Sequence, residues 1–261
     1  MKKRGQKKTA QKKVPESYIK RDYRLAAMEK DLVSSRVHIK ETDLHILADG
    51  DVTALARELV LAARLQLESY IQKRPLFMSS LIPLPADPLA PPLIREMLKA
   101  GLEAQVGPMA AVAGAIARYV GEGLLGAGFR EVIVENGGDL FLNRSESCTV
   151  AIFAGQSPLS YNIGIRIKGE HMPCGVCTSS GTVGHSLSFG DADSVTVVAD
   201  SVALADAAAT RLGNEVGRGR GSKTGVNMAL AQAKTIQGLR GVVIICDEVM
   251  GAIGDVEIVR L

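Results

Sequence analysis

The chain has 261 residues, of which 46% are hydrophobic and 23% charged, so it can bury a substantial core and has the composition of an ordinary globular protein. Tryptophan is absent and aromatic residues make up only 4%, which disfavours the stacking platforms that single-stranded nucleic acids use. Four cysteines are too few for a disulfide framework and predict free thiols in a reducing compartment.

The net charge of +3 is unevenly distributed. Residues 1–24 contain ten Lys or Arg against two acidic residues, so the rest of the chain is mildly acidic. We expect residues 1–24 to form a basic, flexible arm and residues 25–261 to form a single domain. Nucleic-acid or membrane binding would depend on the arm alone, and neither is expected of the folded body. No apolar signal segment follows the basic start, which predicts a cytoplasmic protein.

The first half of the chain predicts strands followed by helices. The expected strands fall within residues 37–47, and the expected helices cover 53–72, 92–104 and 107–125. Pro75 ends the first of these helices. Six prolines lie in residues 75–92, which predicts an irregular segment; if the domain has two lobes, this segment would connect them.

The second half predicts mainly strands. Strands are expected over residues 131–135, 140–142, 150–153, 162–168, 194–199, 242–246 and 256–259, and helices over 201–212 and 223–237. The last strand is expected to pair beside 242–246. Because the strands come in hairpin-like pairs, the pattern favours an α/β (α+β) fold with a mixed, largely antiparallel sheet and flanking helices.

Asp206 and Thr210 form a candidate metal site. They are four residues apart on a predicted helix, so they share one face, and three alanines between them leave room for an anionic ligand. A carboxylate beside a hydroxyl suits a hard cation such as Mg²⁺, which takes oxygen ligands. An exposed polar helix face would show the same spacing.

The sequence Asn136-Gly137-Gly138-Asp139 lies between two predicted strands. The two glycines allow a sharp turn and a close approach of backbone to a ligand, and Asp139 would offer an acceptor to a ligand hydroxyl or ring N–H. A hairpin with a Gly-Gly turn explains the pattern equally well.

A second loop is rich in hydroxyls and glycines and ends at His185. Such a loop can offer successive N–H and O–H donors to phosphates, and the imidazole of His185 can hold a phosphate or supply a proton. The candidate ligand-binding residues in it are Thr178, Ser179, Ser180 and Gly181.

Cys174 and Cys177 form a CxxC motif just before that loop. One interpretation is a redox or sulfur-transfer pair, which needs a lowered thiol pKa. A zinc site would need four ligands, and His171 supplies only a third. Two inert thiols are the remaining alternative. Cys148 and Cys246 lie in apolar strands and are expected in the core.

Taken in order, these motifs resemble the ApbE superfamily, the FAD:protein FMN transferases, and most closely its uncharacterised ApbE-like branch. The resemblance covers roughly residues 37–260. The segment from Gly107 to Gly114 resembles the family's glycine-rich helix start, and 134–139 resembles its Asn-x-Gly-Gly-Asp element. Residues 178–181 resemble its Thr-Ser-Gly loop, with His185 as the following histidine. Residues 205–210 match its metal-binding Ala-Asp-Ala-x-x-Thr.

The resemblance implies an ApbE-like, T-fold-like architecture that binds FAD with Mg²⁺. The transferases cleave the pyrophosphate of FAD and attach FMN to a hydroxyl of an acceptor protein. Two family residues have no match here: residues 109–114 lack the lysine of the Ile-Ala-Lys-Gly element, and residues 185–189 lack the acid that should follow the histidine.

Three functional hypotheses follow. The first is a flavin-nucleotide protein, with or without transferase activity, in which Asp206 and Thr210 hold Mg²⁺ and His185 acts at the phosphates. The ligand would also contact Gly107, Gly137, Gly138, Asp139 and residues 178–181. The second is a thiol-based sulfur-transfer protein using Cys174 and Cys177, because the uncharacterised branch has been linked to sulfur assimilation. The third is a non-catalytic binding protein, and a homo-oligomer is compatible with all three.

Overall fold

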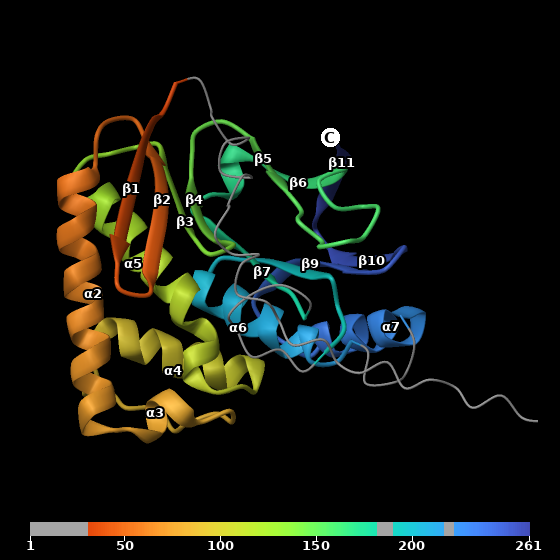
Figure 1. Ribbon diagram of the computed structural model, residues 1–261, viewed down its shortest axis with the longest axis horizontal. Helices are drawn as coiled ribbons and strands as arrows, with labels where there is room; N and C mark the ends of the chain where they lie inside the picture. The colour runs from red at the N-terminus through yellow and green to blue at the C-terminus, as the bar shows by residue number, and fades with distance from the viewer. Residues whose placement is uncertain (1–30, 182–189, 217–221) are drawn as a thin grey trace, which may run out of the picture.

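The computed structural model describes residues 31–181, 190–216 and 222–261 (Figure 1). Its strands are β1 (Val33–Ile39), β2 (Thr42–Ala48), β3 (Val132–Asn136), β4 (Asp139–Asn143), β5 (Cys148–Ala151), β6 (Ile163–Ile167), β7 (Cys174–Ser179), β8 (Ser194–Ala199), β9 (Leu239–Cys246), β10 (Val249–Gly254) and β11 (Glu257–Arg260). Its helices are α2 (Thr53–Lys73), α3 (Leu76–Ser79), α4 (Pro92–Ala104), α5 (Val112–Gly126), α6 (Val202–Gly213) and α7 (Ser222–Ala233), with short 3-10 helices η2 (Pro108–Ala111) and η3 (Gly169–His171). The predicted arm of residues 1–24 and His185 lie outside the described residues.

The strands form two sheets in which every described pairing is antiparallel. The main sheet has the order β1-β2-β3-β4-β7-β8-β9-β10, and a small sheet has the order β11-β6-β5. This confirms the predicted α/β fold with largely antiparallel sheets and flanking helices. Among the described residues, no helix is both long and apolar enough to cross a membrane.

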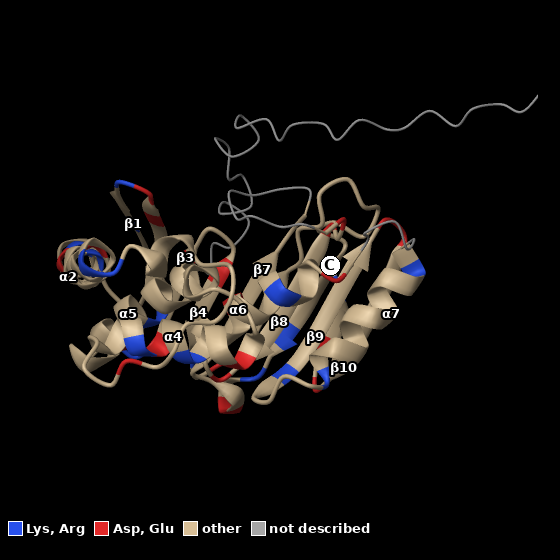
Figure 2. Cartoon of the chain, turned by 90° about the horizontal axis from the view of Figure 1, so that it is seen from below, with Lys and Arg blue, Asp and Glu red and all other residues tan. Residues whose placement is uncertain are grey.

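The main sheet separates two apolar layers because side chains alternate along each strand. On one face, Val195, Val197 and Ile244 belong to the same apolar cluster as the helices. Helices α6 and α7 lie along this part of the sheet (Figure 2). On the other face, Val198, Val243 and Ile245 pack against the small sheet. Each long strand of this region is therefore buried on both sides, which explains its nearly continuous apolar sequence.

Two local predictions are confirmed at residue level. The predicted helix 92–104 and the predicted strand 194–199 have the bounds of α4 and β8. The Gly-Gly turn also forms: Asn136 pairs with Asp139, and the intervening Gly137 and Gly138 have φ of 69° and 113°. Positive φ at both central residues is the signature of a type I′ hairpin, which glycine adopts without strain.

The prediction that residues 256–259 pair beside 242–246 is wrong. The neighbour of β9 is β10, whereas β11 pairs with β6 in the small sheet. The chain crosses from one sheet to the other between β10 and β11, and this crossing leaves no mark in the hydrophobic pattern.

Residues 75–92 are largely irregular, as expected, apart from the single turn of α3. They join α2 to α4, and both helices contribute buried side chains to the same apolar layer. The segment therefore connects two helices whose buried side chains belong to one apolar layer.

Candidate functional site

Helix α6 is held unusually close to its neighbours by two glycines. A Cβ on Gly114 of α5 would lie 2.6 Å from the Val202 carbonyl oxygen and 2.9 Å from the Asp206 Cβ. A Cβ on Gly175 of β7 would lie 2.6 Å from the Val202 Cα. Because neither position has room for a side chain, α6 can approach both α5 and β7 and bring Asp206 to the first turn of α5.

Asp206 binds the amino end of α5. Its Oδ2 accepts a hydrogen bond from the Gly114 N–H at 2.9 Å, and the Ala113 N–H also favours its charged form. These N–H groups have no partner within the helix, and they lie at the positive end of the helix dipole. Nearby, the Asn136 side chain donates to the Ala113 carbonyl at 3.0 Å, which ties the Gly-Gly hairpin to the same turn.

The Asp139 side chain lies near the Asp206 carboxylate and comes from strand β4 of the main sheet. It is the register partner of Cys177 across β4 and β7, and it is buried. The Cys177 thiol and the Thr178 N–H hydrogen-bond to its carboxylate. The Cys177 Sγ also lies 3.4 Å from the Val202 carbonyl oxygen. The hairpin, β7 and α6 therefore meet at a pair of carboxylates.

The two carboxylates resist ionisation in this setting. Burial raises the pKa of Asp139 well above its ordinary value, and the neighbouring Asp206 carboxylate raises it further. Burial also raises the pKa of Asp206 to about 7, against the opposing effect of the Gly114 and Ala113 N–H groups. Two close carboxylates with raised pKa values often mark a functional site. A bound cation would offset both the burial of the charged groups and the repulsion between them.

The donor set fits a hard cation that a ligand helps to hold. Asp206 is half-buried, and Thr210 lies one turn further along α6 with similar exposure, whereas the three alanines between them are buried. Among the described residues, no group of three or more His, Cys, Asp or Glu is arranged to hold a metal. Mg²⁺ often takes only one or two carboxylates and completes its shell with water and substrate phosphates.

The hydroxyl-rich loop begins where β7 ends. Strand alternation places Ser179 on the same face as Cys177, and its Oγ is buried with no hydrogen-bond partner among the described residues. Thr178 points to the other face, where its hydroxyl is 3.0 Å from that of Thr196. The Gly181 N–H donates to the Ala192 carbonyl at 2.8 Å. Of the predicted loop donors, Ser179 is thus the one with an available hydroxyl on the carboxylate face.

Packing accounts for the glycine at position 107, where a ligand contact is predicted. A Cβ there would lie 1.8 Å from the Ser80 carbonyl oxygen, so residues 80–81 fill the space that a side chain would need. The glycine of that motif that reaches the carboxylates is Gly114, seven residues later. The sequence motif includes Gly114, and a glycine at the start of a helix is a usable signal for such a close contact.

The structure also argues against a redox or sulfur-transfer pair at Cys174 and Cys177. Both residues are in β7, and an odd spacing along a strand sends their side chains to opposite faces. Cys174 packs between the two sheets and Cys177 packs against the helices. Burial raises the pKa of Cys174 to about 12 and that of Cys177 well above its usual value. His171 does not complete a zinc site with them among the described residues.

This burial predicts slow thiol chemistry. All four cysteines are buried as free thiols, including Cys148 and Cys246 as expected. The native protein should therefore react with Ellman's reagent at neutral pH far more slowly than the denatured protein, in which all four thiols are exposed and should react at once. Rapid labelling of Cys174 or Cys177 in the native protein would contradict the assignment and revive the sulfur-transfer hypothesis.

The family described as AbpE bacteria matches residues 25–258 of the chain. The chain belongs to this ApbE-like family. The ApbE-like protein is 43% identical to a UPF0280 protein of Methanococcus maripaludis over 225 residues, which covers 85% of this chain and 90% of the relative. It is 42% identical to a UPF0280 protein of Methanosarcina acetivorans over 225 residues, covering 86% of this chain and 87% of that protein.

Solved structures show the same fold at much lower identity. The Pseudomonas stutzeri flavinyl transferase ApbE in its apo form superposes on the ApbE-like protein with a TM-score of 0.55 at 13% identity, covering 87% of this chain and 96% of that one. The flavin transferase ApbE of Vibrio cholerae has a TM-score of 0.51 at 16% identity, covering 85% and 96%. The likeness confirms the expected ApbE-like architecture.

Proposed function

We propose that this protein binds a flavin nucleotide, FAD or a related pyrophosphate compound, together with Mg²⁺, and acts as a flavin or nucleotidyl transferase on a protein acceptor. The observation that carries the proposal is the carboxylate pair. Asp139 and Asp206 come from separate elements of an ApbE-like fold and meet beside the positive end of α5.

Each residue of the site has a separate task in this proposal. Asp206 and Asp139 would supply carboxylate oxygens to the cation, with the Thr210 hydroxyl at the edge of the same helix face. The glycine turn at Gly137 and Gly138 would let a ligand approach the backbone, and the buried Ser179 hydroxyl would hydrogen-bond to a phosphate. When bound, Mg²⁺ would neutralise charge that builds up on the phosphates during transfer.

The expected role of His185 at the phosphates stays a proposal, because this residue lies outside the described part of the chain. Residues 109–114 lack the family lysine, and the segment contains no positively charged residue. Binding and transfer are therefore tested separately: the carboxylate pair supports binding of a cation and nucleotide, and attachment of FMN to an acceptor with release of AMP tests transfer.

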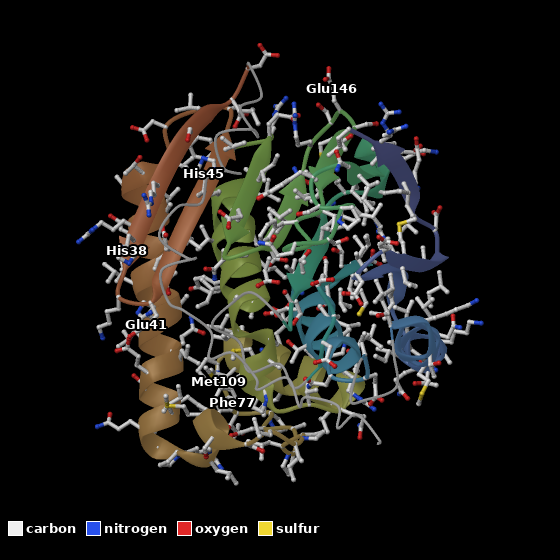
Figure 3. All side chains as sticks on the ribbon, turned by 45° about the vertical axis from the view of Figure 1, so that its right-hand side comes forward. His38, Glu41, His45, Phe77, Met109 and Glu146 are labelled. Carbon is white, nitrogen blue, oxygen red and sulfur yellow. The ribbon has the colours of Figure 1, made fainter. Side chains whose placement is uncertain are left out.

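The first experiment measures both properties on the full-length protein. FAD fluorescence and calorimetry with and without Mg²⁺ should show binding that Mg²⁺ strengthens at least tenfold, or by about 1.4 kcal/mol. Asp139→Asn should remove the Mg²⁺ effect. Glu146→Gln, an exposed carboxylate far from α6 (Figure 3), is the matched control and should behave as the wild type.

The outcomes divide the hypotheses. Mg²⁺-dependent FAD binding with FMN labelling of an acceptor peptide and release of AMP supports a transferase, because the acceptor hydroxyl takes the FMN and AMP is the leaving group. Binding without turnover supports the non-catalytic binding protein. If FAD does not bind in the high micromolar range with or without Mg²⁺, the flavin proposal is wrong.

A further inference from the structure

The proline-rich segment, residues 75–92, presents large apolar side chains to solvent. Five of them are between 61% and 96% exposed and are called the apolar ridge here: Leu76, Met78, Leu81, Ile82 and Leu89. Single exposed apolar residues are ordinary, but five within fourteen consecutive residues form a cluster of the kind that marks a protein contact.

The ridge is held on a rigid support. Phe77 is buried beneath it and meets the Tyr70 ring of α2 edge to face, with ring centroids 5.1 Å apart. The Tyr70 hydroxyl donates to Asp87 at 2.9 Å, which fastens the far end of the segment to the same helix. With six prolines as well, the segment loses little conformational freedom when it is covered, so binding there carries a small entropy cost.

The other side of the segment is fixed against η2. The Ser80 carbonyl lies where a Cβ of Gly107 would stand, and Phe77 and Met109 lie at the same lower end of the molecule (Figure 3). The segment that carries the apolar ridge is therefore already packed against the core of its own chain. Its inward side chain Phe77 is already packed, and the outward side chains remain exposed among the described residues.

The low charge of the segment favours a contact between two copies of it. Residues 75–92 contain one charged side chain, Asp87, and this carboxylate is occupied by the Tyr70 hydroxyl and by Arg74 at 3.3 Å. Two copies of the ridge can meet about a two-fold axis without placing like charges opposite each other. A two-fold contact uses the same patch on both chains, so a patch without unpaired charge is self-compatible.

The area is also sufficient. At their observed exposures, five residues of this size present on the order of 600 Å² per chain, so a two-fold contact that covered all of them would bury up to about 1,200 Å², the lower end of stable interfaces. We propose that the apolar ridge is the contact surface of a homodimer. This proposal is independent of the flavin proposal, because no residue of the ridge takes part in the carboxylate site.

The test is the mass of the full-length protein in solution. Sedimentation across micromolar concentrations should show a monomer–dimer equilibrium. The double variant Ile82→Glu/Leu89→Glu should raise the dissociation constant at least a hundredfold, because both charges would be buried opposite their own copies. Both positions are exposed, so the thermal unfolding of the monomer should remain that of the wild type.

The control is a pair of exposed leucines away from the segment. Leu61 and Leu65 on α2 are 48% and 69% exposed, and Leu61→Glu/Leu65→Glu should leave the dimer intact. A monomeric wild type, a ridge variant that still dimerises, or a dimer lost only in the α2 variant would each overturn the proposal. So would a monomer that sediments with vesicles of phosphatidylcholine and phosphatidylglycerol through the ridge, since the ridge would then serve a lipid surface.

Discussion

Asp206→Asn should abolish the Mg²⁺ dependence of nucleotide binding and at the same time make the metal-free protein more stable above neutral pH. The amide keeps an oxygen that can accept the Gly114 N–H, so the helix contact survives. It loses the charge that a cation requires, and it no longer has to be ionised in a buried setting.

The pH dependence follows from the direction of the shift. The folded-state pKa of Asp206 is raised from 3.8 to about 7, so the folded protein holds a proton that the unfolded chain releases at lower pH. The carboxyl group therefore stabilises the folded state least at high pH: the free energy of unfolding falls as pH rises from about 4 to about 7 and then levels off. Mg²⁺ should restore part of it.

The measurement is denaturant unfolding without Mg²⁺ at a series of pH values. At about pH 8 the Asn variant should exceed the wild type by on the order of 2 kcal/mol, because each pKa unit is worth about 1.4 kcal/mol and Asp206 keeps some exposure. Near pH 4 the two proteins should differ little. If the Asn variant is the less stable protein at high pH and Mg²⁺ never stabilises the wild type, Asp206 is a structural cap of α5 only.

Gly114→Ala should destabilise the protein and weaken cation binding together. The new methyl group would stand 2.6 Å from the Val202 carbonyl oxygen and 2.9 Å from the Asp206 Cβ, and a helix backbone cannot move aside as a flexible side chain can. Overpacking of this kind typically costs about 1–3 kcal/mol. Separating α5 from α6 also lengthens the hydrogen bond that positions Asp206.

The same helix offers a matched control. Gly126 is the last residue of α5, and a Cβ there would meet no atom within 4 Å. Gly126→Ala should be neutral or stabilising by up to about 1 kcal/mol, because alanine is the better helix former. Thermal unfolding and Mg²⁺ titration of both variants check the prediction. Equal effects at the two positions would mean that the close approach of the helices is not what Gly114 provides.

The sequence predicted the parts of the fold that local chemistry decides. The six-residue strand β8 and the Gly137-Gly138 turn follow from apolar runs and from glycine at positive φ, and helix α4 follows from its apolar spacing after Pro92. The pairing of strands that are distant in the chain is not decided by local sequence. Glycine at positions 251 and 254 weakened the strand signal of β10, and the partner of β11 depends on where the chain leaves the main sheet.

The candidate site divides in the same way. Asp206, Asp139 and the hydroxyl loop were found from their residue types and the family resemblance, and the structure brings the two carboxylates together. The glycine-rich motif predicts a contact at Gly107, whereas the tight contact with α6 is made by Gly114. Which glycine of a motif is needed depends on the element packed against it, and that element is 92 residues away in the chain.

Strand β7 has one further consequence, for how related sequences should be compared. A search for Cys-x-x-Cys would score positions 174 and 177 as one motif, but the two side chains lie in different apolar layers, on opposite faces of the main sheet. Changes at 174 should track the residues of β5 and β6 that share its layer, and changes at 177 should track those at 139 and 206. Relatives that keep one cysteine and lose the other are therefore expected, and they should not be taken as having lost a catalytic pair.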